Sequence, residues 1–230
     1  MEILSKSLSI LLNLLIDQRE ILKIPLIVFL GFVLITLVML TFIPLIIIFP
    51  PLSILIAIFS IVLLGALYIL IYHRINAKGW KESITRYLKD LNTSLVGSAI
   101  VGIAMLLSNY TILTIYQVIS TSSFIGIIII VFALFMKMII DYEIFKFISS
   151  YVSSRSIRET IKQMLNIKLS VFLGFLVVTV LFQTVYFLIT YSLDSIIAAQ
   201  DPIILTILQT LHFLLDLIKT FWLFIIVKGE

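Results

Sequence analysis

Long apolar runs are the feature of this sequence that most restricts its fold. One helix of about 20 apolar residues crosses bilayer hydrocarbon. Runs such as Ile46 to Phe49 and Ile127 to Phe132 lack the alternation of a membrane β-barrel. Charged residues make up only 12% of the chain, against about a quarter in a soluble domain, so only lipid can cover the apolar surface. The sequence therefore predicts an all-α polytopic membrane protein.

Prolines and polar breaks divide the apolar sequence into spans. Pro50-Pro51 and Ser120 to Ser123 mark two short outer turns, and Asp194 to Asp201 forms the longest outer loop. No soluble segment is long enough to build a second core, so we expect a single transmembrane domain over residues 1–230. The six predicted spans cover residues 24–43, 51–72, 95–119, 124–140, 169–191 and 202–227.

An amphipathic segment precedes each predicted pair of spans. Residues 1–23 place polar side chains at four-residue spacing on one side and leucines on the other. We therefore expect a bundle of three transmembrane hairpins, each preceded by a cytoplasmic interfacial helix. In the second and third helices the apolar stripes are Trp80, Ile84, Tyr87, Leu88 and Leu91, then Ile157, Ile161, Met164 and Leu165.

The basic residues fall on one side of the predicted membrane. None of the 16 Lys and Arg residues lies in the three outer turns, so the positive-inside rule places both termini in the cytoplasm of a multi-pass cell-membrane protein. We favour the lipid bilayer as the partner of the basic helices. Anionic headgroups attract each Lys or Arg near the membrane surface by about 1 kcal/mol. A cytoplasmic ATPase or other membrane subunits are alternatives, and interrupting acids such as Glu82 disfavour nucleic acid. The candidate residues are Arg74, Lys78, Lys81, Arg86, Lys89, Arg155, Arg158 and Lys162.

A short internal repeat agrees with the hairpin organisation. The letters VFLGF occur at 28–32 and again at 171–175, and Thr36 corresponds to Thr179. A chance match is the alternative, because the chain is rich in Ile, Leu and Phe. We expect three units of surface helix plus hairpin, all in the same orientation.

The sixth predicted span has a polar face. Gln209, His212, Asp216 and Lys219 follow one another in steps of three, four and three residues, which places them on one side of a helix. An ionisable side chain at membrane depth faces the protein interior or a wet cavity. The four residues form either a proton or ion relay or a structural network in which Asp216 pairs with Lys219 or His212. Because these three side chains can neutralise one another, the structural alternative is the stronger for the face by itself.

Polar residues of other spans can extend this face. Asn109 and Gln117 lie in the third predicted span, and Thr179, Gln183 and Thr184 lie in the fifth. Each alone is expected to form an interhelical hydrogen bond. Together they predict a polar interior where the third, fifth and sixth spans meet.

Signatures of cofactor or metal chemistry are missing from the sequence. The chain has no cysteine, and its two histidines, His73 and His212, lie in different regions. His212 and Asp216 alone give fewer ligands than a metal site needs. Phosphate-binding loops and zinc-protease motifs are absent too, so we expect no cofactor and no resident metal. An intramembrane enzyme remains open as a third alternative, behind the two functions given below.

Six spans behind an N-terminal surface helix resemble, in topology, the membrane half of ABC-2 type exporters. Hairpins combined with surface helices also resemble the mitochondrial carriers, although the carriers' signature of Pro, acidic and basic residues is absent here. The leading prediction is a small permease or translocation-pathway subunit, in which His212, Asp216 and Lys219 handle charge. The alternative is a non-transporting scaffold or accessory subunit of a larger membrane complex.

Overall fold

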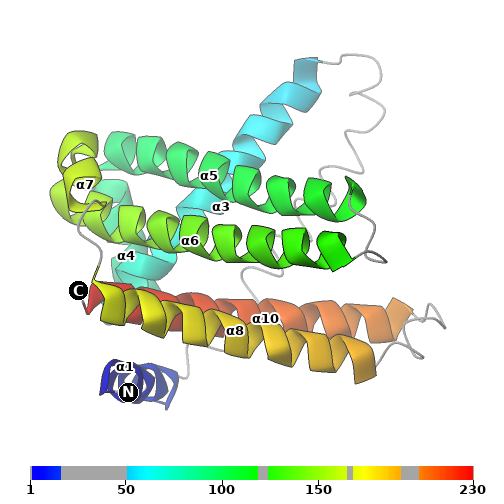
Figure 1. Ribbon diagram of the computed structural model, residues 1–230. Coiled ribbons are helices and arrows are strands. Elements are labelled where there is room, and N and C mark those ends of the chain that lie inside the picture. Colours follow the sequence, from blue (N-terminus) through cyan, green and yellow to red (C-terminus); the bar gives the residue numbers. More distant parts are fainter. Residues whose placement is uncertain (1, 17–50, 119–123, 165–167, 193–201, 230) are drawn as a thin grey trace. The chain divides into compact units, whose positions relative to one another are not determined.

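The computed structural model describes residues 2–16, 51–118, 124–164, 168–192 and 202–229, and the regular structure within these ranges is entirely helical (Figure 1). This confirms the all-α prediction for the described part of the chain. Its eight helices are α1 (Glu2–Ile16), α3 (Pro51–Ile75), α4 (Trp80–Lys89), α5 (Leu91–Val118), α6 (Phe124–Ser154), α7 (Ile157–Met164), α8 (Leu169–Ser192) and α10 (Pro202–Lys228).

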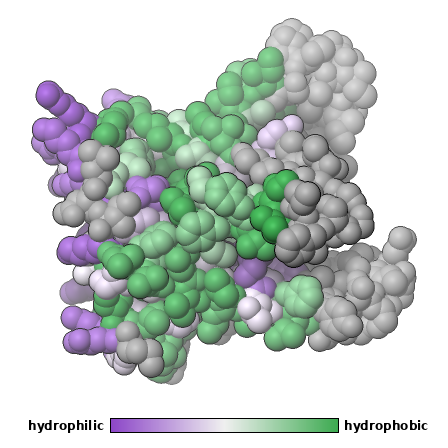
Figure 2. All heavy atoms as spheres, in the orientation of Figure 1, coloured by the Kyte–Doolittle hydropathy of each residue, from purple (hydrophilic) through white to green (hydrophobic). Residues whose placement is uncertain are grey.

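Four of the described helices are long and apolar enough to cross a membrane. Apolar side chains make up most of the coloured surface in Figure 2, and hydrophilic ones gather at the left edge of the view, the side on which α7 lies in Figure 1. The structure is therefore compatible with an integral membrane protein. The predicted span at 24–43 lies outside the described residues, so the six-span layout and the cytoplasmic termini stay predictions. The four candidate spans are Ile54–Ile75, Leu91–Tyr110, Leu169–Ile189 and Thr210–Lys228.

Helix α6 is longer than the sequence indicated. The predicted fourth span ends at residue 140, whereas α6 continues without a break to Ser154. Its 31 residues extend about 46 Å, which exceeds the about 30 Å of bilayer hydrocarbon. The helix continues because its buried side stays apolar through Tyr142, Ile148 and Tyr151. The charges that follow residue 140 therefore do not end the helix.

The helices belong to two compact units. Unit 1 contains α1, α10 and α8 from Leu173 onward. Unit 2 contains α3 from Ile56, helices α4 to α7, and the first turn of α8. The single transmembrane domain over residues 1–230 stays a prediction.

Within unit 2, α3 and α5 cross with their backbones in contact. A Cβ atom added to Gly65 would collide with the carbonyl oxygen of Ser98, and one added to Gly102 would collide with that of Ile61. Both positions thus require the absence of a side chain. Ser98 and Gly102 lie four residues apart, a small-residue spacing that favours close helix approach, and Gly65 is their counterpart on α3.

Helices α4 and α7 occupy the positions of the second and third predicted surface helices. In α4 the predicted apolar stripe is divided between interior and exterior. Tyr87 of the stripe is buried, whereas Ile84 and Leu88 are exposed. Ser83, outside the stripe, is fully buried and its hydroxyl donates to the Leu70 carbonyl oxygen at 2.8 Å. The interfacial position of both helices stays a prediction.

In unit 1, α1 packs against α10. The indole N–H of Trp222 donates to Ser7 Oγ at 2.9 Å. Ile3 and Leu4 of α1 lie next to Gly174 near the start of α8. A Cβ atom added to Gly174 would lie 3.8 Å from Ile3 and 4.0 Å from Leu4, which is ordinary van der Waals contact. Helix α1 is described to Ile16, and residues 17–23 of the predicted surface helix lie outside the described residues.

Candidate functional site

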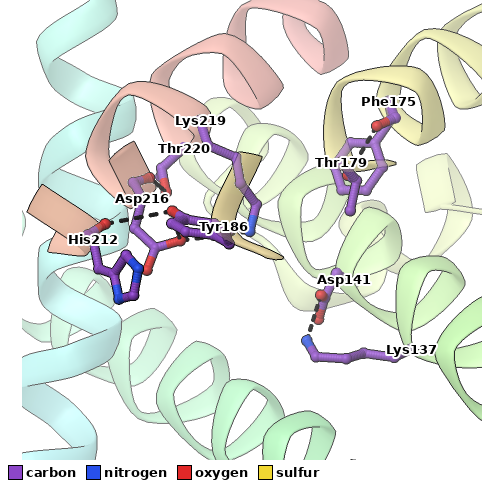
Figure 3. Close-up of polar contacts among 9 residues, drawn as sticks. All are labelled: Lys137, Asp141, Phe175, Thr179, Tyr186, His212, Asp216, Lys219 and Thr220. Atoms are coloured by element: carbon purple, nitrogen blue, oxygen red, sulfur yellow. Dashed lines mark hydrogen bonds and ion pairs between the residues drawn. The ribbon is translucent and has the colours of Figure 1, made fainter. Parts of the chain in front are cut away.

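The polar face of α10 meets a tyrosine of α8 (Figure 3). The hydroxyl of Tyr186 donates to Asp216 Oδ1 at 2.7 Å, and it lies 3.4 Å from the carbonyl oxygen of His212. The imidazole of His212 stands edge-on to the Tyr186 ring, with ring centroids 5.3 Å apart. Tyr186 therefore links two of the predicted residues, His212 and Asp216, to the neighbouring helix.

Lys219 completes this group, which we call the Asp216 cluster: Tyr186, His212, Asp216 and Lys219. The Lys219 Nζ atom lies 3.6 Å from Asp216 Oδ1 and 5.9 Å from the centroid of the Tyr186 ring. A direct charge-assisted hydrogen bond would be shorter, about 2.7–2.9 Å. The ammonium thus compensates the charge of the carboxylate without being tightly bound to it.

The carboxylate of the cluster is open rather than sealed. The Asp216 side chain is 60% exposed, while that of Lys219 is 23% exposed. Nε2 of His212 is buried and has no hydrogen-bond partner among the described residues. A carboxylate in contact with hydrocarbon is costly, so a membrane-spanning α10 requires water or polar groups beside Asp216.

Tyr186 is the member of the Asp216 cluster that sequence reasoning missed. The buried stripe of α8 runs through Phe175, Val178 and Phe182, and Tyr186 takes the next place in it. The spacing of three or four residues between members of this stripe would have placed Tyr186 on the buried side of α8. Gln183, the predicted residue of this helix, lies off the stripe and is exposed.

The remaining predicted pathway residues are described only in part. Thr179 is buried and donates to the Phe175 carbonyl oxygen of its own helix at 2.9 Å (Figure 3). Asn109 is exposed and belongs to unit 2, whereas the Asp216 cluster belongs to unit 1. The side chains of Gln117 and Gln209 lie outside the described residues. A polar interior shared by the third, fifth and sixth spans therefore stays a prediction.

Unit 2 contains a second polar group that the sequence analysis did not single out. Lys137 Nζ donates to Asp141 Oδ2 at 2.6 Å, and Ser108 Oγ of α5 donates to Asp141 Oδ1 at 2.9 Å (Figure 3 shows Lys137 and Asp141). Lys137 lies inside the predicted fourth span. The signal was present, because a lysine and an aspartate four residues apart face each other on a helix.

The predicted basic surface residues divide into two groups. Arg74 is only 2% exposed, and its Nη1 donates to the Ala77 carbonyl oxygen at 2.7 Å. Its guanidinium also lies 5.8 Å from the centroid of the Trp80 ring, so Arg74 holds the α3–α4 loop instead of facing lipid. The others are exposed: Lys78, Lys81, Arg86, Lys89, Arg155, Arg158 and Lys162.

Two of the exposed arginines form ion pairs. Arg86 binds Glu82 at 2.6 Å within α4, and Arg155 binds Asp90 at 2.7 Å. The backbone N–H of Lys78 donates to Glu82 at 2.8 Å. This hydrogen bond, and after it the one from Arg86, lowers the pKa of Glu82 below its ordinary value.

The fold and the cluster together are compatible with a helical membrane protein that has a charge-compensated polar group in α10. Comparisons with protein-family models, with curated proteins and with solved structures found no match to this chain. Among the described residues, no group of three or more His, Cys, Asp or Glu side chains is placed to hold a metal ion. The functional argument therefore rests on the Asp216 cluster itself.

Proposed function

We propose that the chain is a small multi-pass permease of the cell membrane, or a subunit of a translocation pathway, in which the Asp216 cluster handles charge. The observation that supports this is the open carboxylate of Asp216 within an apolar helix. A carboxylate that only held two helices together would be expected to be enclosed by its partners. This one keeps more than half of its side-chain surface free for water, a proton or a cation.

The contacts of the carboxylate allow it to exchange partners. Tyr186 fixes the position of Asp216 through Oδ1 without neutralising its charge. An incoming cation or proton can displace the Lys219 ammonium from Asp216. The ammonium is loosely held, since it lies 3.6 Å from Oδ1 and ends a long, flexible side chain. In the proposed mechanism Lys219 compensates the empty carboxylate and moves away when the carboxylate is occupied.

The second candidate function is a scaffold or accessory subunit of a larger membrane complex. The observation that favours it is the charge balance of the cluster, because Asp216 finds both its ammonium partner and its hydroxyl donor within unit 1. Such a group can join α8 to α10 and do nothing else. The two functions differ in whether water reaches Asp216 from both sides of the membrane.

Cysteine accessibility distinguishes the two functions. The chain has no cysteine, so a single introduced thiol reacts without background. In sealed membrane vesicles of both orientations, we expect Asp216→Cys to react with a membrane-impermeant thiol reagent from either side. The control Leu211→Cys, an exposed apolar position of the same helix, should not react. Protection of Asp216→Cys from both sides, or reaction from one side only, would refute a pathway and favour the scaffold.

Two further measurements address the substrate and the partners. In proteoliposomes that contain a pH-sensitive dye, Asp216→Asn should abolish proton-coupled flux or make it independent of pH while the protein keeps its helical circular dichroism. Extraction from the native membrane in mild detergent should reveal whether a stoichiometric ATPase co-purifies. In that case the exposed arginines and lysines of α4 and α7 are the docking residues we propose. Purification of the chain without a partner protein would favour a self-contained permease.

A further inference from the structure

The second polar group, in unit 2, repeats the arrangement of the Asp216 cluster. We call it the Asp141 group: Ser108, Lys137 and Asp141. Ser108 of α5 donates to Asp141 Oδ1 at 2.9 Å, as Tyr186 of α8 donates to Asp216 Oδ1 at 2.7 Å. In both groups a lysine on the helix of the aspartate compensates its charge, and Figure 3 shows the two carboxylates with their lysines. Each group therefore joins a hydroxyl of one helix to a charge pair of the next described helix.

The helices α4 and α7, which precede the two groups, share a sequence pattern. The letters KESI at 81–84 of α4 correspond to RETI at 158–161 of α7, at a spacing of 77 residues. The hydroxyl residue of each pattern, Ser83 or Thr160, is fully buried, and the isoleucine after it is exposed. Two unrelated amphipathic helices would be expected to bury the isoleucine and expose the hydroxyl. The shared exception indicates that α4 and α7 are copies of one element.

The helices α5 and α8, which follow these elements, bury their side chains at corresponding positions. Each buried residue of α5 from 94 to 105 has a buried counterpart in α8, 77 positions later. Two of the pairs are identical residues, Gly97 with Gly174 and Val101 with Val178. The same spacing therefore relates both the surface helices and the helices after them, as expected of an internal repeat. The buried positions are 94, 97, 98, 101, 102 and 105 in α5, and 171, 174, 175, 178, 179 and 182 in α8.

The helices α3, α6 and α10 fit the same repeat. Ile71, Ile148 and Ile225 follow one another at steps of 77 residues, and all three are buried. Within unit 2, corresponding residues of α3 and α6 also contact each other, because the Tyr72 hydroxyl lies 3.1 Å from Ser149 Oγ, 77 positions later. The three helices therefore hold the same place in successive repeats.

The repeat places the two polar groups in matching positions. With a spacing of 77 residues, Tyr186 corresponds to the residue after Ser108, and Asp216 corresponds to the residue two positions before Asp141. Both displacements are smaller than one helical turn of about 3.6 residues. The Asp141 group is thus the counterpart, in the preceding repeat, of the Asp216 cluster.

The two groups differ in how tightly the lysine holds the carboxylate. Lys137 Nζ lies 2.6 Å from Asp141 Oδ2, and only 20% of the Asp141 side chain is exposed. Lys219 Nζ lies 3.6 Å from Asp216, whose side chain is 60% exposed. The Asp141 group is therefore a closed form of the arrangement that is open at Asp216.

The side chains of the Asp141 group suit the exchange of an ammonium for a proton. A hydroxyl both donates and accepts, so Ser108 can stay bonded to Asp141 whether the carboxyl is ionised or neutral. An ammonium only donates, so Lys137 is held by the ionised form alone. A proton that binds Asp141 Oδ2 neutralises the carboxylate and releases Lys137, which keeps its own protons. A hard metal cation collects about six oxygen ligands, more than the group provides among the described residues.

We propose that the Asp141 group is a second proton site of the chain, at which a proton replaces the Lys137 ammonium on Asp141. The inference rests on the proposed function, because it gives Asp141 the role proposed for Asp216. The groups that face Asp141 are Lys137 on its own helix and Ser108 on α5. Lys146, the next lysine of α6, donates instead to a backbone carbonyl at 3.3 Å.

Reaction with dicyclohexylcarbodiimide tests the proposal on the unmodified chain in lipid vesicles. This apolar reagent enters the membrane and adds to a carboxyl that holds a proton, and mass spectrometry of the peptides locates the adduct. We expect adducts at Asp141 and Asp216. A carboxylate that serves only as one half of a structural ion pair does not take up a proton and gives no adduct. Asp90 is the control, because it is paired with Arg155 at 2.7 Å and lies outside the candidate spans.

A substitution of the lysine tests the exchange itself. Lys137→Met removes the ammonium that competes with the proton, so the rate of adduct formation at Asp141 should rise about tenfold or more. The rate at Asp216 should stay unchanged, because its own lysine is Lys219. Equal rates at Asp141 with and without Lys137 would show that the ammonium and the proton do not compete, and would overturn the proposed exchange.

The outcomes separate this inference from the proposed function. An adduct at Asp216 without one at Asp141 would refute the second site and leave the proposed function standing. Slower reaction of Asp141 in sodium or potassium chloride than in choline chloride of equal concentration would assign the site to an alkali cation and overturn the proton. The reaction of Asp216→Cys with an impermeant thiol reagent, which involves no carboxyl at position 216, tests the proposed function separately.

Discussion

At the crossing of α3 and α5, we predict that the single methyl group added by Gly65→Ala destabilises the protein. Alanine at position 65 places its Cβ against the backbone carbonyl of Ser98, which, unlike the end of a side chain, cannot rotate away. The two helices have to separate, and both lose contacts along their interface. Overpacking of this kind costs about 1–3 kcal/mol of unfolding free energy. In a membrane helix pair the loss is not offset elsewhere, since close packing is itself the main attraction between the helices.

Gly174→Ala is the matched control for Gly65→Ala. An added Cβ at position 174 would meet its nearest neighbour, in Ile226, at 3.6 Å, which is ordinary contact. Both substitutions gain the same helix propensity, about 1 kcal/mol, so the difference between the variants isolates the steric effect. We expect Gly174→Ala to be neutral or stabilising by up to about 1 kcal/mol.

Thermal unfolding in a mild detergent, followed by circular dichroism, measures this difference. For a chain of this length about 2 kcal/mol corresponds to a difference of about 4–8 °C in unfolding midpoint. Gly102→Ala should resemble Gly65→Ala, because its Cβ would meet the carbonyl of Ile61. If Gly65→Ala unfolds at the same temperature as Gly174→Ala, the backbones are not in contact and the reasoning is refuted.

Three further predictions concern the polar groups. Lys137→Met leaves the partly buried carboxylate of Asp141 without its cation and should lower the unfolding free energy by about 1–3 kcal/mol. The double variant Lys137→Met, Asp141→Leu should recover part of this loss in the same melting assay, and a strictly additive loss would contradict the pairing. Tyr186→Phe removes one hydrogen bond to a carboxylate and should cost about 1 kcal/mol, while a melting midpoint equal to that of the unmodified chain would show that the hydroxyl does not hold Asp216. The lowered pKa of Glu82 means that its stabilisation of α4 is present above the ordinary pKa of 4.5 and is lost as the pH falls through the lower folded value. An NMR titration of the Glu82 carboxyl should therefore have its midpoint below 4.5, and a midpoint at or above that value would contradict the two hydrogen bonds.

Helix positions followed from the sequence where the boundary has a local cause. Pro51 and Pro202 each begin a helix as predicted, since proline suits a first helical turn and its missing N–H has no partner there. The start of α8 at Leu169 was predicted from the end of a polar segment. Each of these boundaries depends on residues within a few positions, which a sequence displays directly.

The end of α6 and the role of Tyr186 depended on distant residues. Lys146 lies beyond the predicted end of the span and is buried because its ammonium donates to the Met164 carbonyl oxygen at 3.3 Å. Hydropathy counts such a residue as a break in the helix, although its partner allows the helix to continue. Tyr186 reads as one more apolar residue of a span until Asp216 of another helix is placed beside it. On α5 the sequence shows the contact side of the α3–α5 crossing, because the small residues Ser98 and Gly102 lie four positions apart. On α3 no sequence pattern marks Gly65 as their counterpart.

The contact between α1 and α10 has a consequence for biosynthesis. The hydrogen bond between Ser7 and Trp222 joins residues 215 positions apart. At about 5–20 residues per second, a ribosome needs about 10–40 s to make the intervening chain. Throughout that time the first helix emerges without its packing partner, while all of the residues from Ile56 to Phe172 become available for unit 2. Assembly of unit 2 can therefore precede that of unit 1, and a chain truncated before its last helix would leave α1 exposed to proteases.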